Sequence, residues 1–284
     1  MSLGAHMSVA GGFAKAFERG ESIGCETMQI FVTNPNRWQA PPLTDEEVAL
    51  FREAASASPI RPVIAHDMYL INLCSPDDTL WKRSLRAFQD ELERADRLGC
   101  CCVVMHPGAH MGAGEEVGLQ RLVDALDRLR DAMPDLQVKV ALETTAGQGS
   151  NLGYRFEHLA EVIARVQDAR WLTVCLDTCH VFAAGYELRT AEGYAETWRQ
   201  FDDIVGIGRL QLIHMNDAKS ELGSHVDRHE HIGDGKLGAA AFCQIVNDPR
   251  LAHLPMILET PELGDLDIAK RDLDALRSLI ADKA

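Results

Sequence analysis

Six short apolar stretches of the sequence end in a histidine or a carboxylate, and these side chains can bind a metal ion. The six residues are His66, His106, Glu143, Asp177, His214 and Glu259, and His6 ends a seventh stretch. Taken alone, such a residue is more often a helix cap or a hydrogen-bonded core group. Gathered in one place, they would bury several charges, and divalent cations commonly compensate such burial. The pattern predicts a metal site if the fold brings the ends of the stretches together.

Two short segments carry further ligand types. DTCH at 177–180 directly follows one of the stretches, and DRH at 227–229 lies in a loop flanked by glycines. An extended backbone turns residues two apart to the same side, so the aspartate and the histidine of DRH could share an ion. In DTCH, Cys179 is an alternative ligand to His180. We favour His180, because a thiolate suits a closed structural zinc site better than a catalytic pocket.

The two segments raise the number of potential ligands to nine. They are five imidazoles (His66, His106, His180, His214 and His229) and four carboxylates (Glu143, Asp177, Asp227 and Glu259). At about three protein ligands per ion, this set holds about three divalent ions and leaves positions open for water and substrate. Imidazole-rich sites favour Zn²⁺, with Mn²⁺ or Fe²⁺ as substitutes, over Mg²⁺, which prefers oxygen ligands. Such ions would make the pocket positive and suit it to an anionic substrate.

The elements that must position these residues alternate along the whole chain. Eight β-branched or apolar stretches predict strands at 3–6, 28–32, 62–66, 101–106, 138–143, 173–177, 210–214 and 256–260. Amphipathic segments predict helices at 12–23, 44–57, 78–98, 115–133, 156–166, 190–205, 239–246 and 267–280. Thr44, with Glu47 three residues later, indicates a capping box. Eight alternating units predict an α/β TIM (β/α)₈ barrel, whose strands all end at one face and place the metal site there.

We expect a single catalytic domain over residues 1–284, because no Pro-, Gly- or Ser-rich linker divides the chain. A doubly wound open sheet is the alternative architecture. Such a sheet usually carries a Gly-rich phosphate loop after its first strand, and the AGG segment at 10–12 is only a weak match. The eight alternating units favour the barrel.

The composition excludes some classes of protein. With 28 basic and 43 acidic residues the formal net charge is −15, so DNA binding would need a local source of positive potential in place of a broad basic surface. The eight cysteines include three consecutive ones at 100–102 and no C-x-x-C pair, which indicates buried, reduced thiols. We find no signal peptide and no apolar segment of about 18 residues. We expect a soluble cytoplasmic protein that does not contact membranes.

Several longer motifs contain the nine potential ligands and follow one another in a defined order. They are GAHMS at 4–8, HDMYLINL at 66–73, HPG at 106–108, LETTAGQGSNLG at 142–153, DTCH at 177–180, HMND at 214–217, DRH at 227–229 and LETP at 258–261. Together they resemble the endonuclease IV family of apurinic/apyrimidinic (AP) DNA endonucleases. The similarity runs through essentially the whole chain.

The resemblance implies a xylose-isomerase-like TIM barrel with three Zn²⁺ ions. The implied reaction is hydrolysis of the phosphodiester 5′ to an abasic site in duplex DNA, which leaves a 3′-hydroxyl group. The implied ligand sets are His66, His106 and Glu143 for the first ion, Glu143, Asp177, His214 and Glu259 for the second, and His180, Asp227 and His229 for the third. We expect Glu143 and Glu259 to be catalytic, with a water-derived nucleophile close to Glu143 and no attack by a protein side chain.

The loop at 34–38 is similar to the DNA-probing loop of the family. Either Asn36 or Arg37 occupies the place of the arginine that some members insert into the base stack. Trp38, Tyr69 and Asn72 are candidate wedges in the duplex, because an abasic nucleotide is easily extruded and inserted side chains stabilise a kink. Ordinary packing is the alternative role for Trp38 and Tyr69.

Lys219 and Arg228 lie in loops near the expected metal face and could contact phosphates, with solvated surface charge as the alternative. We expect a monomer whose partner is duplex DNA with abasic sites. The rival function is a sugar isomerase or epimerase on the same barrel with one divalent ion, since the fold hosts both chemistries. Such an enzyme has no use for a third ligand set, which favours the nuclease. A metal-storage protein would not explain ligands at strand ends.

Overall fold

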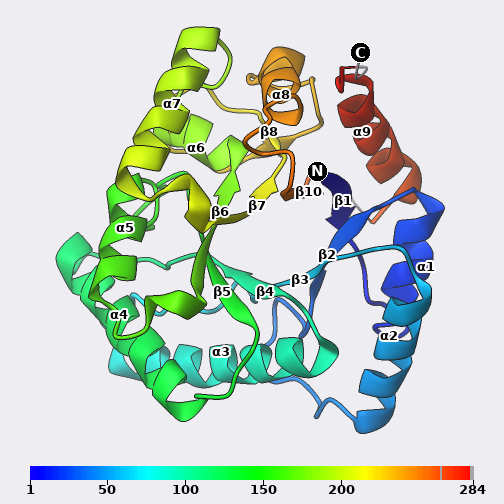
Figure 1. The fold of residues 1–284 in the computed structure, drawn as a ribbon. Coiled ribbons are helices and arrows are strands. Elements are labelled where there is room, and N and C mark those ends of the chain that lie inside the picture. The colour runs from blue at the N-terminus through cyan, green and yellow to red at the C-terminus, as the bar shows by residue number, and fades with distance from the viewer. Residues whose placement is uncertain (263, 282–284) are drawn as a thin grey trace.

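The computed structural model, which describes residues 1–262 and 264–281, contains a closed barrel of eight parallel strands surrounded by helices (Figure 1). The strands are β1 (Ser2–His6), β2 (Thr27–Phe31), β3 (Val63–His66), β4 (Cys102–Met105), β5 (Lys139–Glu143), β6 (Leu172–Asp177), β7 (Leu210–His214) and β10 (Pro255–Leu258). They follow one another around the barrel in chain order, and β10 closes it by pairing with β1. The predicted barrel is confirmed, and the open-sheet alternative is excluded.

The helices lie outside the sheet and connect its strands (Figure 1). They are α1 (Lys15–Ser22), α2 (Asp45–Ala57), α3 (Asp78–Leu98), α4 (Glu115–Ala132), α5 (Phe156–Arg165), α6 (Thr178–Ala184), α7 (Ala191–Ile204), α8 (Gly238–Val246) and α9 (Leu266–Ser278). The capping box predicted before α2 is present, since Thr44 Oγ1 accepts from Glu47 N and Glu47 Oε2 accepts from Thr44 N. The sequence did not indicate α6, because almost all of this short helix is buried and it lacks an amphipathic period.

Two short strands, β8 (Asp217–Ala218) and β9 (His229–Glu230), pair antiparallel above the barrel and were also not predicted. One close approach within the barrel requires a glycine. A Cβ atom on Gly4 of β1 would lie 1.9 Å from the carbonyl oxygen of Thr27 in β2. The first residue of the GAHMS motif therefore lets the first two strands pack together.

The core has two parts. A small cluster fills the barrel interior, and its members are Ile64, Cys102, Val104, Ala141, Cys175, Leu212 and Ile257. A larger cluster lies mainly between the sheet and the helices. The eight cysteines are free, and six of them are buried, whereas Cys101 is half-buried and Cys243 is exposed. None of the helices in the described ranges is long and apolar enough to cross a membrane.

Candidate metal centre

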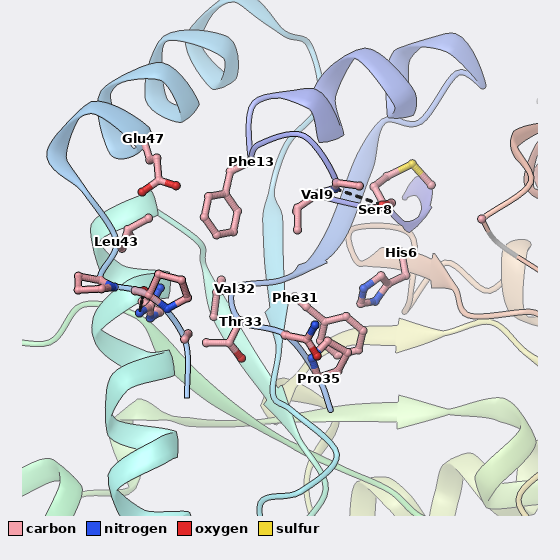
Figure 2. A pocket seen from close by; sticks show the side chains of 18 residues that line it. His6, Ser8, Val9, Phe13, Phe31, Val32, Thr33, Pro35, Leu43 and Glu47 are labelled. Atoms are coloured by element: carbon pink, nitrogen blue, oxygen red, sulfur yellow. Dashed lines mark hydrogen bonds between the residues drawn. The ribbon is translucent and has the colours of Figure 1, made fainter. Parts of the chain in front are cut away.

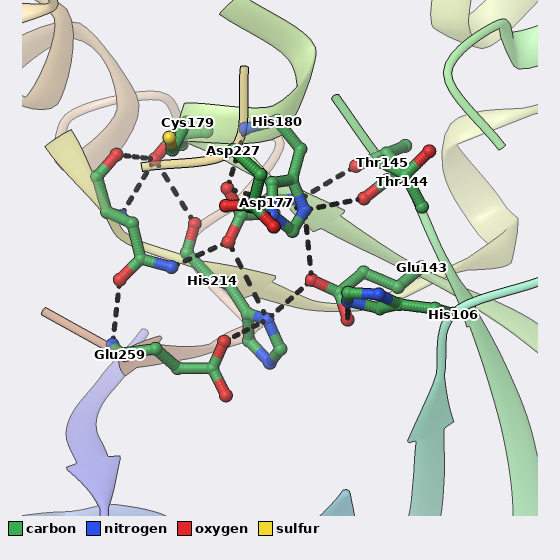
Figure 3. Close-up of polar contacts among 12 residues, drawn as sticks. His106, Glu143, Thr144, Thr145, Asp177, Cys179, His180, His214, Asp227 and Glu259 are labelled. Carbon is green, nitrogen blue, oxygen red and sulfur yellow. Dashed lines mark hydrogen bonds and ion pairs between the residues drawn. The ribbon is translucent and has the colours of Figure 1, made fainter. Parts of the chain in front are cut away.

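The polar residues predicted at the strand ends converge at one mouth of the barrel (Figure 3). His66, Glu143, Asp177 and His214 are the last residues of β3, β5, β6 and β7. His106 and Glu259 directly follow β4 and β10. The convergence follows from the parallel topology, because every strand of the barrel points its carboxyl end at the same face.

Glu143 is fully buried at the centre of this group. Its Oε2 atom lies 3.2 Å from His66 Nε2 and 3.1 Å from His106 Nε2. Its Oε1 atom lies 3.0 Å from His214 Nδ1 and 3.3 Å from His180 Nδ1. One carboxylate therefore faces four imidazoles, three at the ends of β3, β4 and β7 and one in α6, and can bridge two sets of ligands.

The nine predicted residues form three groups, of which the first two share Glu143, and within each group the potential ligand atoms lie no more than 4.8 Å apart. The groups are His66, His106 and Glu143, then Glu143, Asp177, His214 and Glu259, and finally His180, Asp227 and His229. The expected proximity within DRH is present, since His229 Nε2 lies 3.4 Å from Asp227 Oδ1. The structure thus brings together the same three sets that the family resemblance implied.

Cys179 also lies within ligand distance of Asp177 and His229. Burial raises the pKa of its thiol, which disfavours the thiolate that a metal requires. Its Sγ donates to the backbone carbonyl of Arg228 at 3.6 Å. His180, by contrast, places Nε2 3.2 Å from Asp227 Oδ1. These contacts favour the imidazole over the thiol as the ligand.

The second nitrogen of several imidazoles is already committed to a hydrogen bond. The Nδ1 atoms of His66, His180 and His229 donate to the backbone carbonyls of Asp67, Thr144 and Glu259 at 2.9, 2.8 and 2.9 Å. Such bonds select the tautomer whose other nitrogen is bare, as metal-binding imidazoles require. The donor set and its outer contacts therefore fit a cluster of divalent ions.

Charge within the centre is balanced between carboxylates and imidazoles. Burial raises the pKa of Glu143, but His106 and His214 outweigh it and hold that pKa well below its usual range. Burial lowers the pKa of His180, but the carboxylates of Asp177 and Asp227 outweigh it and raise that pKa well above its usual value. The Glu143 carboxylate thus remains ionised at neutral pH and attracts positive charge, which divalent ions can supply as they displace protons from the imidazoles.

A cavity of about 350 Å³ opens over this centre, with the side chains of His106, His180 and Glu259 in its wall. Beside it lies a second, larger pocket of about 520 Å³, which shares His6 and Phe31 with the first (Figure 2). The larger pocket is lined mainly by apolar side chains from the loops after β1 and β2. The groups that can carry out chemistry are therefore in the smaller cavity.

Tyr69 lies at the edge of the smaller cavity, and the residue is 67% exposed. Its ring packs edge-on against Phe31, with 5.5 Å between the centroids. The backbone N–H of Tyr69 donates to the carbonyl of Pro35, so the loop after β3 is joined to the predicted probing loop at 34–38. Asn36 and Arg37 are exposed in the same region. The position of these side chains is compatible with contact to a duplex over the cavity.

Trp38 and Asn72, unlike Tyr69, make extensive contacts with other residues of the protein. Trp38 packs against the core and lies under the guanidinium of Arg83, 4.3 Å from the ring centroid. The Asn72 amide donates to the carbonyl of Ala109 and accepts from the N–H groups of Ala109 and Cys74. These contacts favour a packing role for Trp38 and a loop-holding role for Asn72 over insertion into DNA.

The two predicted phosphate contacts lie beside the centre. Arg228 is exposed between two of the potential ligands and donates to the carbonyl of Asp227. Lys219 is half exposed, with Nζ 3.7 Å from Glu230 Oε2. Both cations belong to the segment that carries β8 and β9, next to the third ligand group.

Side chains of helix α3 form hydrogen bonds with the loops after β2 and β3. Glu91 is fully buried in this helix, and its carboxylate accepts from Thr33 Oγ1 and, at 3.1 Å, from the N–H of Met68. Three residues further along, Arg94 donates to the carbonyl of Pro41. Burial raises the pKa of Glu91 to about 7.

Sequence reasoning missed the residues that orient the potential ligands. Asn216 donates to Asp177 Oδ2 at 2.6 Å and accepts from the N–H of Glu259 at 2.7 Å. Thr144 accepts from the N–H of Asp177. Gln29 in β2 contacts both Glu259 and His214. The available signal was a lone amide within an apolar strand, since a buried amide needs hydrogen-bond partners.

Comparisons with known proteins agree with this geometry. Residues 17–279 match the family described as a xylose isomerase-like TIM barrel. A probable endonuclease 4 from Chloroflexus aurantiacus is 50% identical over 277 residues, which cover 98% of this chain and 97% of that protein. The crystal structure of endonuclease IV from Thermus thermophilus has a TM-score of 0.88 and 34% identity, with 98% of each chain covered.

A D-tagatose 3-epimerase-like protein also superimposes, with a TM-score of 0.74 and 18% identity over 99% of this chain and 98% of that one. This likeness shows a shared fold alone, since one barrel hosts many chemistries. The Chloroflexus relative shares half of the aligned residues over nearly the full length of both chains. Because it shares this identity with the Chloroflexus relative and its fold with the Thermus enzyme, the chain belongs to the endonuclease IV family of AP endonucleases.

Proposed function

We propose that this protein is a DNA-repair endonuclease that hydrolyses the phosphodiester 5′ to an abasic site in duplex DNA and leaves a 3′-hydroxyl group. The observation that supports it is the convergence of nine potential metal ligands in three groups at one mouth of the barrel, where six of the nine line the cavity. We further propose that the groups hold three Zn²⁺ ions, with Mn²⁺ as a substitute. When bound, such ions supply a nucleophile at neutral pH, neutralise the phosphate and stabilise the leaving oxygen.

The chain's own residues would prepare the site for that chemistry. Glu143, buried between four imidazoles, would hold the first two ligand sets in register and lie close to the reacting phosphate. Glu259 would complete the second set from the opposite side of the mouth. Tyr69, exposed at the rim, would contact the distorted duplex, and the exposed Arg37 and Arg228 would contact its phosphates.

All nine potential ligands come from one chain, so a monomer would suffice for this activity. Residues 1–284 would then act as one catalytic domain. The free and mostly buried thiols support a reducing compartment such as the cytoplasm. The epimerase alternative rests on fold likeness, and the third group (His180, Asp227 and His229) supports the nuclease, because a one-metal isomerase does not need it.

The test combines cleavage with metal analysis. We expect the purified protein to cut a duplex with one synthetic abasic residue on its 5′ side, to leave the matched intact duplex uncut, and to produce a 3′ end that a DNA polymerase extends. Plasma mass spectrometry should find about three zinc ions per chain. Glu259→Gln should reduce turnover by orders of magnitude while binding to abasic DNA persists. A ratio near one ion per chain without cleavage would favour the isomerase.

A further inference from the structure

Gln29 is a fully buried amide in β2, at the base of the candidate metal centre. Its Nε2 atom donates to Glu259 Oε1 at 2.5 Å and lies 3.1 Å from His6 Nδ1. Its Oε1 atom accepts from His214 Nε2 at 2.8 Å. One side chain thus connects β2 to two potential ligands of the second group, which lie at the ends of β10 and β7, the second and third strands along from β2 around the barrel.

These contacts leave little freedom in how the groups are protonated. Because the amide oxygen of Gln29 can only accept a hydrogen bond, His214 Nε2 is the donor to it, and Nδ1 is the ring nitrogen left for an ion. His214 Nδ1 then faces Glu143 Oε1 at 3.0 Å and Glu259 Oε2 at 3.1 Å, where an ion of the second group would lie. Glu259 uses Oε1 for Gln29 and keeps Oε2 for the ion. The amide therefore sets a tautomer and a carboxylate orientation together.

The second group differs from the others in this dependence on a side chain. The imidazoles of His66, His180 and His229 are oriented by backbone carbonyls, which no substitution removes. His214 is oriented by the side chain of Gln29. A substitution of Gln29 therefore changes the hydrogen bonds that orient the second ligand group and leaves the backbone contacts of the other two groups intact.

We propose that Gln29 is a positioning residue that sets the affinity of the second ligand group, Glu143, Asp177, His214 and Glu259, for its divalent ion. The inference rests on the proposed function, because it presumes that this group holds an ion. Outer contacts of this kind typically change metal affinity by about 10- to 100-fold when they are lost.

The first test is Gln29→Met, which keeps the length of the side chain and removes its hydrogen bonds. We expect chelator competition to show one zinc ion per chain released about 10- to 100-fold more readily, with the other two unchanged. The matched control is Thr27→Val, which removes a buried hydrogen bond to Pro62 from the same strand without touching a potential ligand. All three affinities should be unchanged in the control.

The second test is a reciprocal exchange. In Glu259→Gln, the new amide at position 259 must point its oxygen at the ion. Its NH₂ group then faces the NH₂ group of Gln29, and two hydrogen-bond donors are in contact. Adding Gln29→Glu supplies an acceptor there and still accepts from His214 Nε2. The double variant should therefore bind the weakened ion more tightly than Glu259→Gln alone, by about tenfold, the equivalent of one hydrogen bond of about 1.4 kcal/mol.

The inference is overturned if Gln29→Met leaves all three affinities unchanged, if all three fall together, or if the double variant shows no recovery. Each of these outcomes presupposes a wild-type protein that holds three ions and cuts abasic DNA. A wild-type protein that lacks those ions refutes the proposed function itself, so the two failures are distinguishable.

Discussion

The protein is acidic, and yet its proposed substrate is a polyanion. The salt dependence of DNA binding therefore tests which positive charges of the protein contact the DNA phosphates. Exposed cations of the described chain lie beside the cavity and the probing loop at 34–38, among them Arg37, Arg83, Lys219 and Arg228. Three divalent ions would change the formal net charge from −15 to −9 and concentrate positive potential at the mouth. Binding should therefore depend on a few local contacts and on the bound ions.

The magnitude follows from the number of cations. Each phosphate contact contributes about −0.9 to the slope of log K against log salt, so about four contacts give a slope of about −3.6. Between about 50 and 200 mM salt, the affinity should then fall about 150-fold. A continuous basic surface with a slope near −8 would lose more than about 10⁴-fold over the same range.

The assay is fluorescence anisotropy of a labelled duplex with one abasic residue, titrated with Glu259→Gln protein of measured zinc content at several salt concentrations. Metal-stripped protein should bind markedly more weakly. Arg228→Ala should make the slope shallower by about 0.9. A slope near −8 that survives removal of the metals would refute the local-field reasoning and leave the enzymatic assignment standing.

Three further predictions concern the metals, the exposed tyrosine and helix α3. Dialysis against a strong chelator should abolish cleavage of abasic DNA, and Zn²⁺ or Mn²⁺ but not Mg²⁺ should restore it; full activity after mass spectrometry shows the metals gone would contradict this. Tyr69→Ala should lower the preference for abasic over intact duplex in competition binding with unchanged zinc content, whereas normal discrimination would assign the ring to packing. Because burial raises the pKa of Glu91 to about 7, the folded state holds a proton between the unfolded pKa of 4.5 and that value, so stability falls as pH rises through this window. Urea unfolding should show that the free energy of unfolding is lower at pH 8 than at pH 5 by at most about 3 kcal/mol, and Glu91→Gln should reduce this difference. An equal difference in the variant would show that another group causes the pH dependence.

The sequence by itself determined the architecture and the identity of the potential ligands. The strands alternate with amphipathic helices, a pattern set by local spacing, and parallel strands in a barrel must end at one face. His66, Glu143 and His214 could therefore be assigned to a common mouth although almost 150 residues separate the first from the last. The partition of the nine residues into three sets came from the family resemblance, since a count of ligands does not say which lie together.

Tertiary structure alone decided which side chains orient the ligands and which are free to meet a substrate. Gln29 is one amide in an apolar strand, and its importance depends on Glu259 and His214 arriving from β10 and β7. Asn72, a predicted wedge, is engaged by the loop after β4, whereas Tyr69 three residues earlier is exposed. Hydrogen bonds between residues far apart in the chain leave no periodic trace in the sequence, because their geometry is set by packing around the whole barrel.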